Sequence, residues 1–156
     1  MPKASAGLLL FRQRDARVEV LLVHPGGPFW SKKDTGAWMI PKGEINEGEE
    51  PLAAARREFQ EETGGDPRGD AVPLPPLRQA GGKLVHAFAV RGDFDPATLS
   101  SNTFTMEWPP RSGRQASFPE VDRAAWMTLA EARRSILPSQ RPLLDALEGL
   151  LADSGS

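Results

Sequence analysis

Three closely spaced glutamates, Glu58, Glu61 and Glu62, are the residues of this sequence best suited to hold a metal ion. Their spacing of i, i+3 and i+4 places all three carboxylates on one face of a helix. They would also lie in the last turns of that helix, where the helix dipole presents partial negative charge and where Lys or Arg would be more stabilising. A divalent cation would remove both conflicts by supplying positive charge, so the pattern predicts a metal site.

The type of metal follows from the ligands that the chain offers. Oxygen-only ligation favours hard cations, so Mg²⁺ or Mn²⁺ is expected rather than Zn²⁺. The sequence has no cysteine and only two histidines, His24 and His86, which excludes thiolate catalysis and Cys/His zinc sites. Each histidine lies in or beside an apolar strand and is expected to be a packed or a surface residue rather than a general base. The alternative is a solvated acidic helix face paired with Arg56 and Arg57.

A longer pattern surrounds the glutamates. From Gly43 to Gly64 the chain reads GEINEGEEPLAAARREFQEETG, which closely resembles the Nudix box. That pattern is Gly, five residues, Glu, seven residues, then Arg-Glu-apolar-any-Glu-Glu-any-Gly-apolar. The matching residues are Gly43, Glu49, Arg57, Glu58, Phe59, Glu61, Glu62 and Gly64. The chain departs from the pattern at Gly65, where the family prefers an apolar residue.

The resemblance implies both a fold and an activity. The fold is α/β, a Nudix-type α/β/α sandwich with a mixed sheet, and we expect one domain over residues 1–156. The activity is metal-dependent hydrolysis of the phosphoanhydride bond of a nucleoside diphosphate linked to another moiety, such as a dinucleoside polyphosphate or a nucleoside triphosphate. The alternative is a nucleotide-sensing module without turnover, but such proteins commonly lose box glutamates, which this chain retains.

The resemblance also assigns roles to residues of the box. The metal would be bound by the carboxylates of Glu58, Glu61 and Glu62 and by the backbone carbonyl of Lys42, beside Gly43. Arg57 would pair with Glu49 and brace the loop that leads into the helix. The family often recruits one more acidic residue before a late strand that contains Trp, and Glu120 precedes Trp126 in that way. Glu120 is therefore the candidate extra ligand or base, and Glu107 competes with it.

The entry to the box, Trp38-Met39-Ile40-Pro41-Lys42-Gly43, resembles that of Nudix enzymes acting on dinucleoside polyphosphates or diphosphoinositol polyphosphates. Lys42 and Trp38 are therefore candidate substrate contacts. A solvated lysine and a core tryptophan are equally open alternatives. Phe29, Trp30 and Arg114 are weaker candidates for holding a base or a phosphate.

The elements that must position these residues follow from hydrophobic periodicity. Apolar runs predict strands at Gly7–Phe11, Val18–Val23, Leu84–Val90, Thr103–Trp108 and Ala124–Met127. Pro51 and Gly64 bound a helix over Pro51–Thr63, with Glu50 as its candidate cap. The segment from Gly64 to Pro76 is predicted to be a loop. A capping box of Thr128 and Glu131 opens a second helix, and Ser139 is expected to open the last.

Composition and net charge limit the kinds of binding partner that we expect. Hydrophobic residues make 39% of the chain and the formal net charge is -2, which is typical of a globular protein without a basic footprint for nucleic acid. The apolar run Leu8–Phe11 is too short for a signal sequence or a membrane span. We therefore expect a small-molecule nucleoside polyphosphate as partner, no nucleic acid or membrane, cytoplasmic location, and a monomer or a homodimer.

Overall fold

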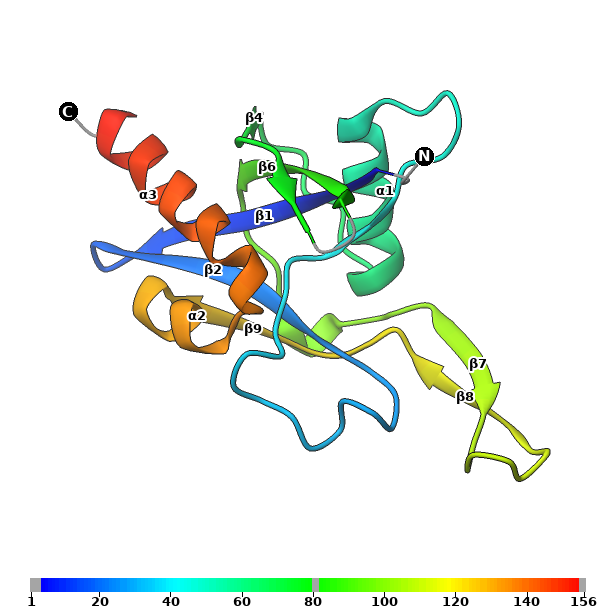
Figure 1. Cartoon of the computed structure of the whole chain (residues 1–156). Helices are drawn as coiled ribbons and strands as arrows, with labels where there is room; N and C mark the ends of the chain where they lie inside the picture. Colours follow the sequence, from blue (N-terminus) through cyan, green and yellow to red (C-terminus); the bar gives the residue numbers. More distant parts are fainter. Residues whose placement is uncertain (1–3, 80–81, 155–156) are drawn as a thin grey trace.

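A computed structural model describes residues 4–79 and 82–154 (Figure 1). The strands are β1 (Ser5–Arg14), β2 (Arg17–Pro25), β3 (Lys42–Glu44), β4 (Ala71–Pro73), β5 (Leu77–Arg78), β6 (Leu84–Arg91), β7 (Thr103–Glu107), β8 (Gln115–Pro119) and β9 (Val121–Thr128). The helices are α1 (Pro51–Thr63), α2 (Leu129–Ser135) and α3 (Arg141–Ser154), with 3₁₀ turns η2 (Pro96–Thr98) and η3 (Pro138–Gln140). None of the helices in the described ranges is long and apolar enough to cross a membrane.

Seven of the strands form one mixed sheet. Its main order is β4-β6-β1-β2-β9, with β3 added to β1 and β5 added to β6. β1 runs parallel to β6, and the other pairs are antiparallel. β3 pairs with residues 5–7 of β1, whereas β2 pairs with residues 11–14. β2 and β3 therefore contact different ends of β1, and the box begins at β3.

Helices cover both faces of the sheet. Successive side chains of a strand point to opposite faces, so Leu8 and Leu10 of β1 pack on one side and Leu9 and Phe11 on the other. α1 buries Ala54, Ala55 and Phe59 against the first side. α3 buries Leu143, Leu144 and Leu147 against the second side. This arrangement confirms the predicted α/β/α sandwich with a mixed sheet.

The β7–β8 hairpin is separate from the main sheet. It forms a two-stranded sheet of its own and projects from the body of the molecule (Figure 1). Phe104 and Phe118 are paired across it. We refer to this hairpin, residues 103–119, as the arm.

The bounds of α1 are as predicted, and Gly64 follows it in the left-handed region at φ 83°. The capping box of Thr128 and Glu131 is also confirmed. Two expectations were wrong. Ser139 does not open the last helix, because it lies inside η3 and α3 begins at Arg141. The segment from Gly64 to Pro76 is not all loop, because Ala71–Pro73 forms the edge strand β4 against β6.

Candidate active site

A pocket of about 340 Å³ lies where α1, β2, β3 and the β8–β9 junction meet. Three of its lining residues are glutamates that sequence reasoning selected, Glu58, Glu62 and Glu120. The remaining residues of the lining are Val23, Pro25, Met39, Lys42, Gly43, Glu44 and Val121. The pocket is therefore the candidate active site.

Glu58 and Glu62 lie one helical turn apart on the same face of α1. Glu62 is buried, with 8% of its surface exposed. Burial and the nearby charges of Glu58 and Glu120 raise the pKa of the Glu62 carboxyl well above its usual range. Buried carboxylates are costly unless they are paired with positive charge or coordinate a metal. The pocket offers carboxylate oxygens, which are the donors that a hard divalent cation prefers.

Gly43 allows the close approach of β3 to α1. A Cβ atom at this position would lie 2.1 Å from Cδ of Glu58, so any other residue would displace that carboxylate. The predicted importance of Gly43 thus has a steric cause. Gly65, the one departure from the box, has a similar explanation, because a Cβ there would lie 2.8 Å from the ring of Phe94.

Arg57 braces the loop before α1, as predicted. Its guanidinium donates two hydrogen bonds to Glu49, at 2.9 and 3.0 Å, and one to the carbonyl of Glu44, at 2.9 Å. The same side chain donates to Glu58 at 2.8 Å. The bonds from Arg57 to Glu49, together with one from the N–H of Asn46, lower the pKa of Glu49 to about 2. Arg57 therefore links the loop to one of the pocket glutamates.

Glu61 lies differently from Glu58 and Glu62. Its carboxylate accepts from Arg57 at 3.2 Å, and it does not line the pocket. Among the described residues, 4–79 and 82–154, no three Asp, Glu, His or Cys side chains lie close enough together to hold a metal ion in this conformation. Glu61 nevertheless raises the pKa of Glu120, after burial and Glu58, so the two glutamates are electrostatic neighbours.

The structure separates the two candidates for the extra acidic residue. Glu120 lines the pocket, and its backbone N–H donates to Asn102, whose own N–H donates to the carbonyl of Glu61. Glu107 lies at the far end of β7, where its carboxylate accepts from the N–H groups of Arg111 and Gly113. Only Glu120 of the two therefore faces the box glutamates. Sequence reasoning missed Asn102 because its contacts use the backbone alone.

The comparisons with known proteins agree with this geometry. A family model described as the NUDIX domain matches residues 1–147. The chain belongs to the Nudix domain family. The prediction of a Nudix hydrolase that acts on phosphoanhydrides is thereby confirmed.

Curated relatives of this Nudix domain include two bacterial proteins named RNA pyrophosphohydrolase. The one from Brucella anthropi is 32% identical over 126 residues, which cover 71% of this chain and 67% of the relative. The one from Caulobacter vibrioides is 27% identical over 158 residues, covering 86% of this chain and 84% of the relative. The match thus extends well beyond the box.

Solved structures share the fold at low identity. A Caenorhabditis elegans Ap4A hydrolase in a binary complex aligns with a TM-score of 0.67 and 21% identity, covering 96% of this chain and 98% of that one. The Nudix domain of Shewanella oneidensis NrtR, complexed with ADP ribose, aligns with a TM-score of 0.68 and 19% identity, covering 97% and 89%. These likenesses support the Nudix fold.

The two substrate-contact candidates of the Nudix domain differ in position. Lys42 lines the pocket, and burial, followed by the charge of Lys83, lowers its pKa. Trp38 is only 5% exposed, and its indole N–H donates to Asp34 at 2.8 Å. Trp38 therefore has the core role that the sequence left open, and Lys42 alone of the two is placed to meet a phosphate.

The histidines do not reach the pocket lining. His24 is fully buried, with Nδ1 2.8 Å from Asp122 and Nε2 2.6 Å from the carbonyl of Lys33. Of the packed and surface alternatives, the structure shows that His24 is packed. His24 ties the loop after β2 to β9, since Asp122 belongs to that strand.

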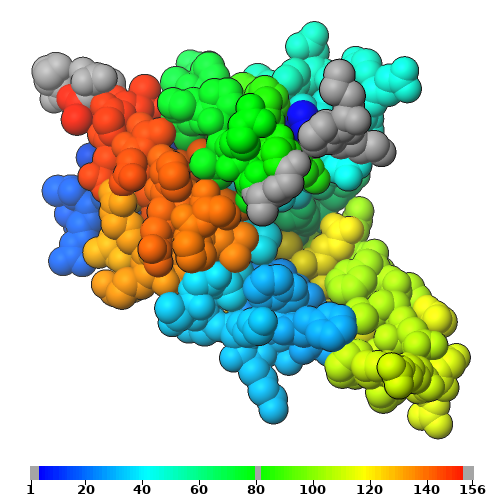
Figure 2. All heavy atoms as spheres, in the orientation of Figure 1, coloured from blue at the N-terminus to red at the C-terminus, as the bar shows by residue number. Residues whose placement is uncertain are grey.

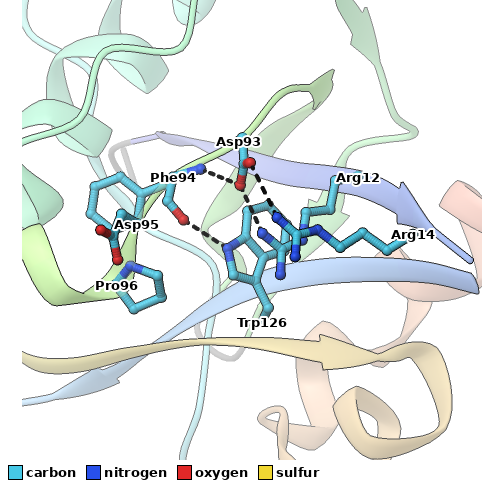
Figure 3. A pocket seen from close by; sticks show the side chains of 7 residues that line it. All are labelled: Arg12, Arg14, Asp93, Phe94, Asp95, Pro96 and Trp126. Carbon is cyan, nitrogen blue, oxygen red and sulfur yellow. Dashed lines mark hydrogen bonds and ion pairs between the residues drawn. The ribbon is translucent and has the colours of Figure 1, made fainter.

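A second pocket, of about 420 Å³, contains none of the box glutamates (Figure 3). Arg12 lies 4.0 Å from the centre of the Trp126 ring and pairs with Glu19 and Asp93. The indole N–H of Trp126 donates to the carbonyl of Phe94 at 2.8 Å. The polar groups of Arg12 and Trp126 are thus already bonded to other protein groups, which favours a structural role for the residues of this pocket. The lining residues are Arg12, Arg14, Asp93, Phe94, Asp95, Pro96 and Trp126.

Proposed function

We propose that this Nudix hydrolase requires Mg²⁺ or Mn²⁺ and cleaves the phosphoanhydride bond of a nucleoside diphosphate linked to a further phosphate-bearing group. The observation that carries the proposal is the pocket in which Glu58, Glu62 and Glu120 face Lys42. Carboxylates crowded in this way call for a cation, and a half-buried lysine beside them suits an anionic substrate.

The residues that would hold the cation are Glu58, Glu61 and Glu62, together with the backbone carbonyl of Lys42. When bound, the cation would neutralise substrate oxygens and lower the pKa of a water molecule that attacks phosphorus. To join Glu58 at the cation, the carboxylate of Glu61 would have to rotate away from Arg57. Its side chain is half-buried, so this rotation is sterically open to it. Arg57, Glu49 and Gly43 would keep the Glu58 carboxylate in place.

Two side chains would act on the substrate itself. The ammonium group of Lys42 would bind a phosphate oxygen and help to orient the scissile bond. Glu120 would accept the proton of the attacking water, since it lies in the pocket and its pKa is raised from its ordinary value. A raised pKa makes a carboxylate a better base near neutral pH.

The substrate class is proposed from the relatives. Two of them are named RNA pyrophosphohydrolase and one structural neighbour is an Ap4A hydrolase. The molecules in these names, RNA and Ap4A, both carry phosphate groups attached to a nucleoside. We therefore place dinucleoside polyphosphates first, with nucleoside triphosphates and 5′-phosphorylated RNA as the other members of the class.

The test is product analysis over a panel of diadenosine tetraphosphate, nucleoside triphosphates, a 5′-triphosphorylated oligonucleotide, ADP-ribose and nucleotide sugars, each with Mg²⁺ and with a chelator. Cleavage of one class that stops with the chelator is the expected result. Binding without cleavage across the panel would overturn the proposal and favour the nucleotide-sensing alternative.

A further inference from the structure

Few large hydrophobic side chains are exposed on this protein. Within the described ranges there are two, Phe29 with 62% of its surface exposed and Val72 with 40%. Val72 lies on the edge strand β4. Phe29 lies in the loop that follows β2, on the way from the pocket residue Pro25 to the box. A single exposed hydrophobic residue is ordinary, so the surroundings of Phe29 decide whether it has a role.

Phe29 is held by a second aromatic ring. The ring of Trp108, at the end of β7, meets it edge to face, with centroids 5.5 Å apart and planes at 83°. Nearer to the body of the molecule, Gly27 lies against Phe104, where a Cβ atom would be 2.9 Å from the ring. The loop after β2 thus lies along the arm, as the blue and yellow-green surfaces of Figure 2 show. Phe29 is therefore fixed in place although it is exposed.

This aromatic pair is close to the active site along the chain. Pro25 lines the pocket, and the N–H of Gly26 donates to the carbonyl of Glu120 at 2.9 Å. Phe29 follows Pro25 by four residues, so their Cα atoms are at most about 14 Å apart. A nucleotide whose phosphates occupy the pocket spans a gap of this order through its ribose and its remaining phosphates.

Basic residues outnumber acidic ones in the two segments that carry the pair. The loop carries Lys32 and Lys33, and the turn of the arm carries Arg111 and Arg114. Glu107, the one acidic residue of the arm, is already occupied by backbone N–H groups of the turn. An exposed aromatic ring on a segment that also carries cationic side chains suits a nucleobase together with its phosphates.

We propose that Phe29, braced by Trp108, is a stacking platform for a nucleobase of the substrate. The inference rests on the proposed phosphoanhydride hydrolysis and narrows its substrate class. The entry to the box resembles enzymes of dinucleoside polyphosphates and of diphosphoinositol polyphosphates alike. The platform selects the first, because a nucleobase has a π face to stack on Phe29 and an inositol ring has none.

A binding experiment tests the platform without relying on catalysis. Calorimetry with AMP and with ribose 5-phosphate isolates the contribution of the base. The intact protein should prefer AMP, Phe29→Ala should lose roughly 5- to 150-fold in that preference, and Phe29→Tyr should retain it. Val72→Ala, the matched exposed control, should behave as the unmodified chain. Equal affinity of the unmodified chain for the two ligands would overturn the platform.

Measurements of turnover then identify which substrate carries the nucleobase that stacks on Phe29. For Phe29→Ala, KM should rise for the preferred base-bearing substrate while kcat stays within about twofold, since stacking acts on binding and not on the reacting atoms. Diadenosine tetraphosphate and a 5′-triphosphorylated oligonucleotide are the two arms, and a diphosphoinositol polyphosphate is the base-free control. An unchanged KM in both arms would overturn the platform. AMP preference without any cleavage would leave the platform standing and refute the hydrolase instead.

Self-association is the competing use of such an arm. Light scattering of the unmodified chain and of Phe29→Ala measures it directly. A mass that falls on substitution, with an unchanged AMP preference, would show that Phe29 contacts a second copy and would overturn the platform. An unchanged mass with lost AMP preference supports it.

Discussion

Glu62 is placed where a sequence selected for stability alone would put an apolar residue. It is buried against Glu58 and Glu120, whose charges oppose its ionisation. Such a conflict is expected where function requires it. The Glu62 carboxyl group therefore destabilises the folded protein and, as proposed, binds the cation. A substitution of Glu62 should change stability and activity in different directions.

Replacing Glu62 by Gln should lower turnover by at least about a hundredfold, since changes outside the direct ligands of metal sites already cost 10–100-fold. Thermal stability should not fall, because the crowding of carboxylates is relieved. Glu61→Gln should lower turnover by a similar factor. Glu50→Gln is the control, since Glu50 precedes the same helix and its side chain makes no capping bond. Full activity in both Glu61→Gln and Glu62→Gln would refute the assignment.

Gly43→Ala tests the contact between β3 and α1. The new methyl group would overlap the carboxylate of Glu58, so we expect this side chain to be displaced and the activity to fall by about tenfold or more. Gly149→Ala is the control, because nothing lies within 4 Å of its Cβ position and alanine is the better helix former by about 1 kcal/mol. Steady-state rates and melting curves of both variants provide the measurement, and a Gly43→Ala protein with unchanged kcat would contradict the steric argument.

At the scale of elements, Arg57 joins the loop before α1 to the helix itself. A planar guanidinium meets Glu49, Glu58 and the Glu44 carbonyl at once, which an ammonium group cannot reproduce. Arg57→Lys should therefore reduce kcat by roughly 10- to 100-fold although the charge is kept. Arg56→Lys, on the neighbouring position of the helix, should retain activity. Equal rates for the two variants would show that charge alone is sufficient.

The elements also explain how much the sequence could predict. The bounds of α1 follow from local signals, Pro51 at its start and Gly64 after its end. The α/β/α sandwich and the pairing of Arg57 with Glu49 were expected from the resemblance to the Nudix family. The choice between Glu107 and Glu120 was not local, because it depends on backbone hydrogen bonds that join Asn102, at the base of the arm, to both Glu61 and Glu120. The burial of Trp38 likewise depends on its contact with His24, which is distant in sequence.

At the scale of the whole molecule, Glu49 predicts an acid-dependent loss of stability. Its folded-state pKa of about 2 lies below the ordinary value of 4.5. Its contribution is therefore fully present above pH 4.5 and is lost as the pH falls toward about 2. Glu49→Gln should lower stability at neutral pH and weaken the pH dependence over this window. Urea unfolding at several pH values gives the free energy of unfolding as a function of pH. If this free energy depended on pH equally in Glu49→Gln and in Glu50→Gln, the prediction would be contradicted.

Cation binding should stabilise the entire fold, because the ligands come from a helix and a strand that unfold together. A ligand at 100 times its dissociation constant contributes about 2.7 kcal/mol, and each kcal/mol raises Tm by about 2–4 °C in a domain of this size. Saturating Mg²⁺ should therefore raise Tm by roughly 5–10 °C, and a chelator should reverse the shift. NaCl at matched ionic strength separates binding from charge screening. If Glu62→Gln gained as much from Mg²⁺ as the unmodified chain, the cation would be bound elsewhere and the proposed site would be refuted, whereas loss of the shift in this variant alone would tie the stabilisation to the buried carboxylate.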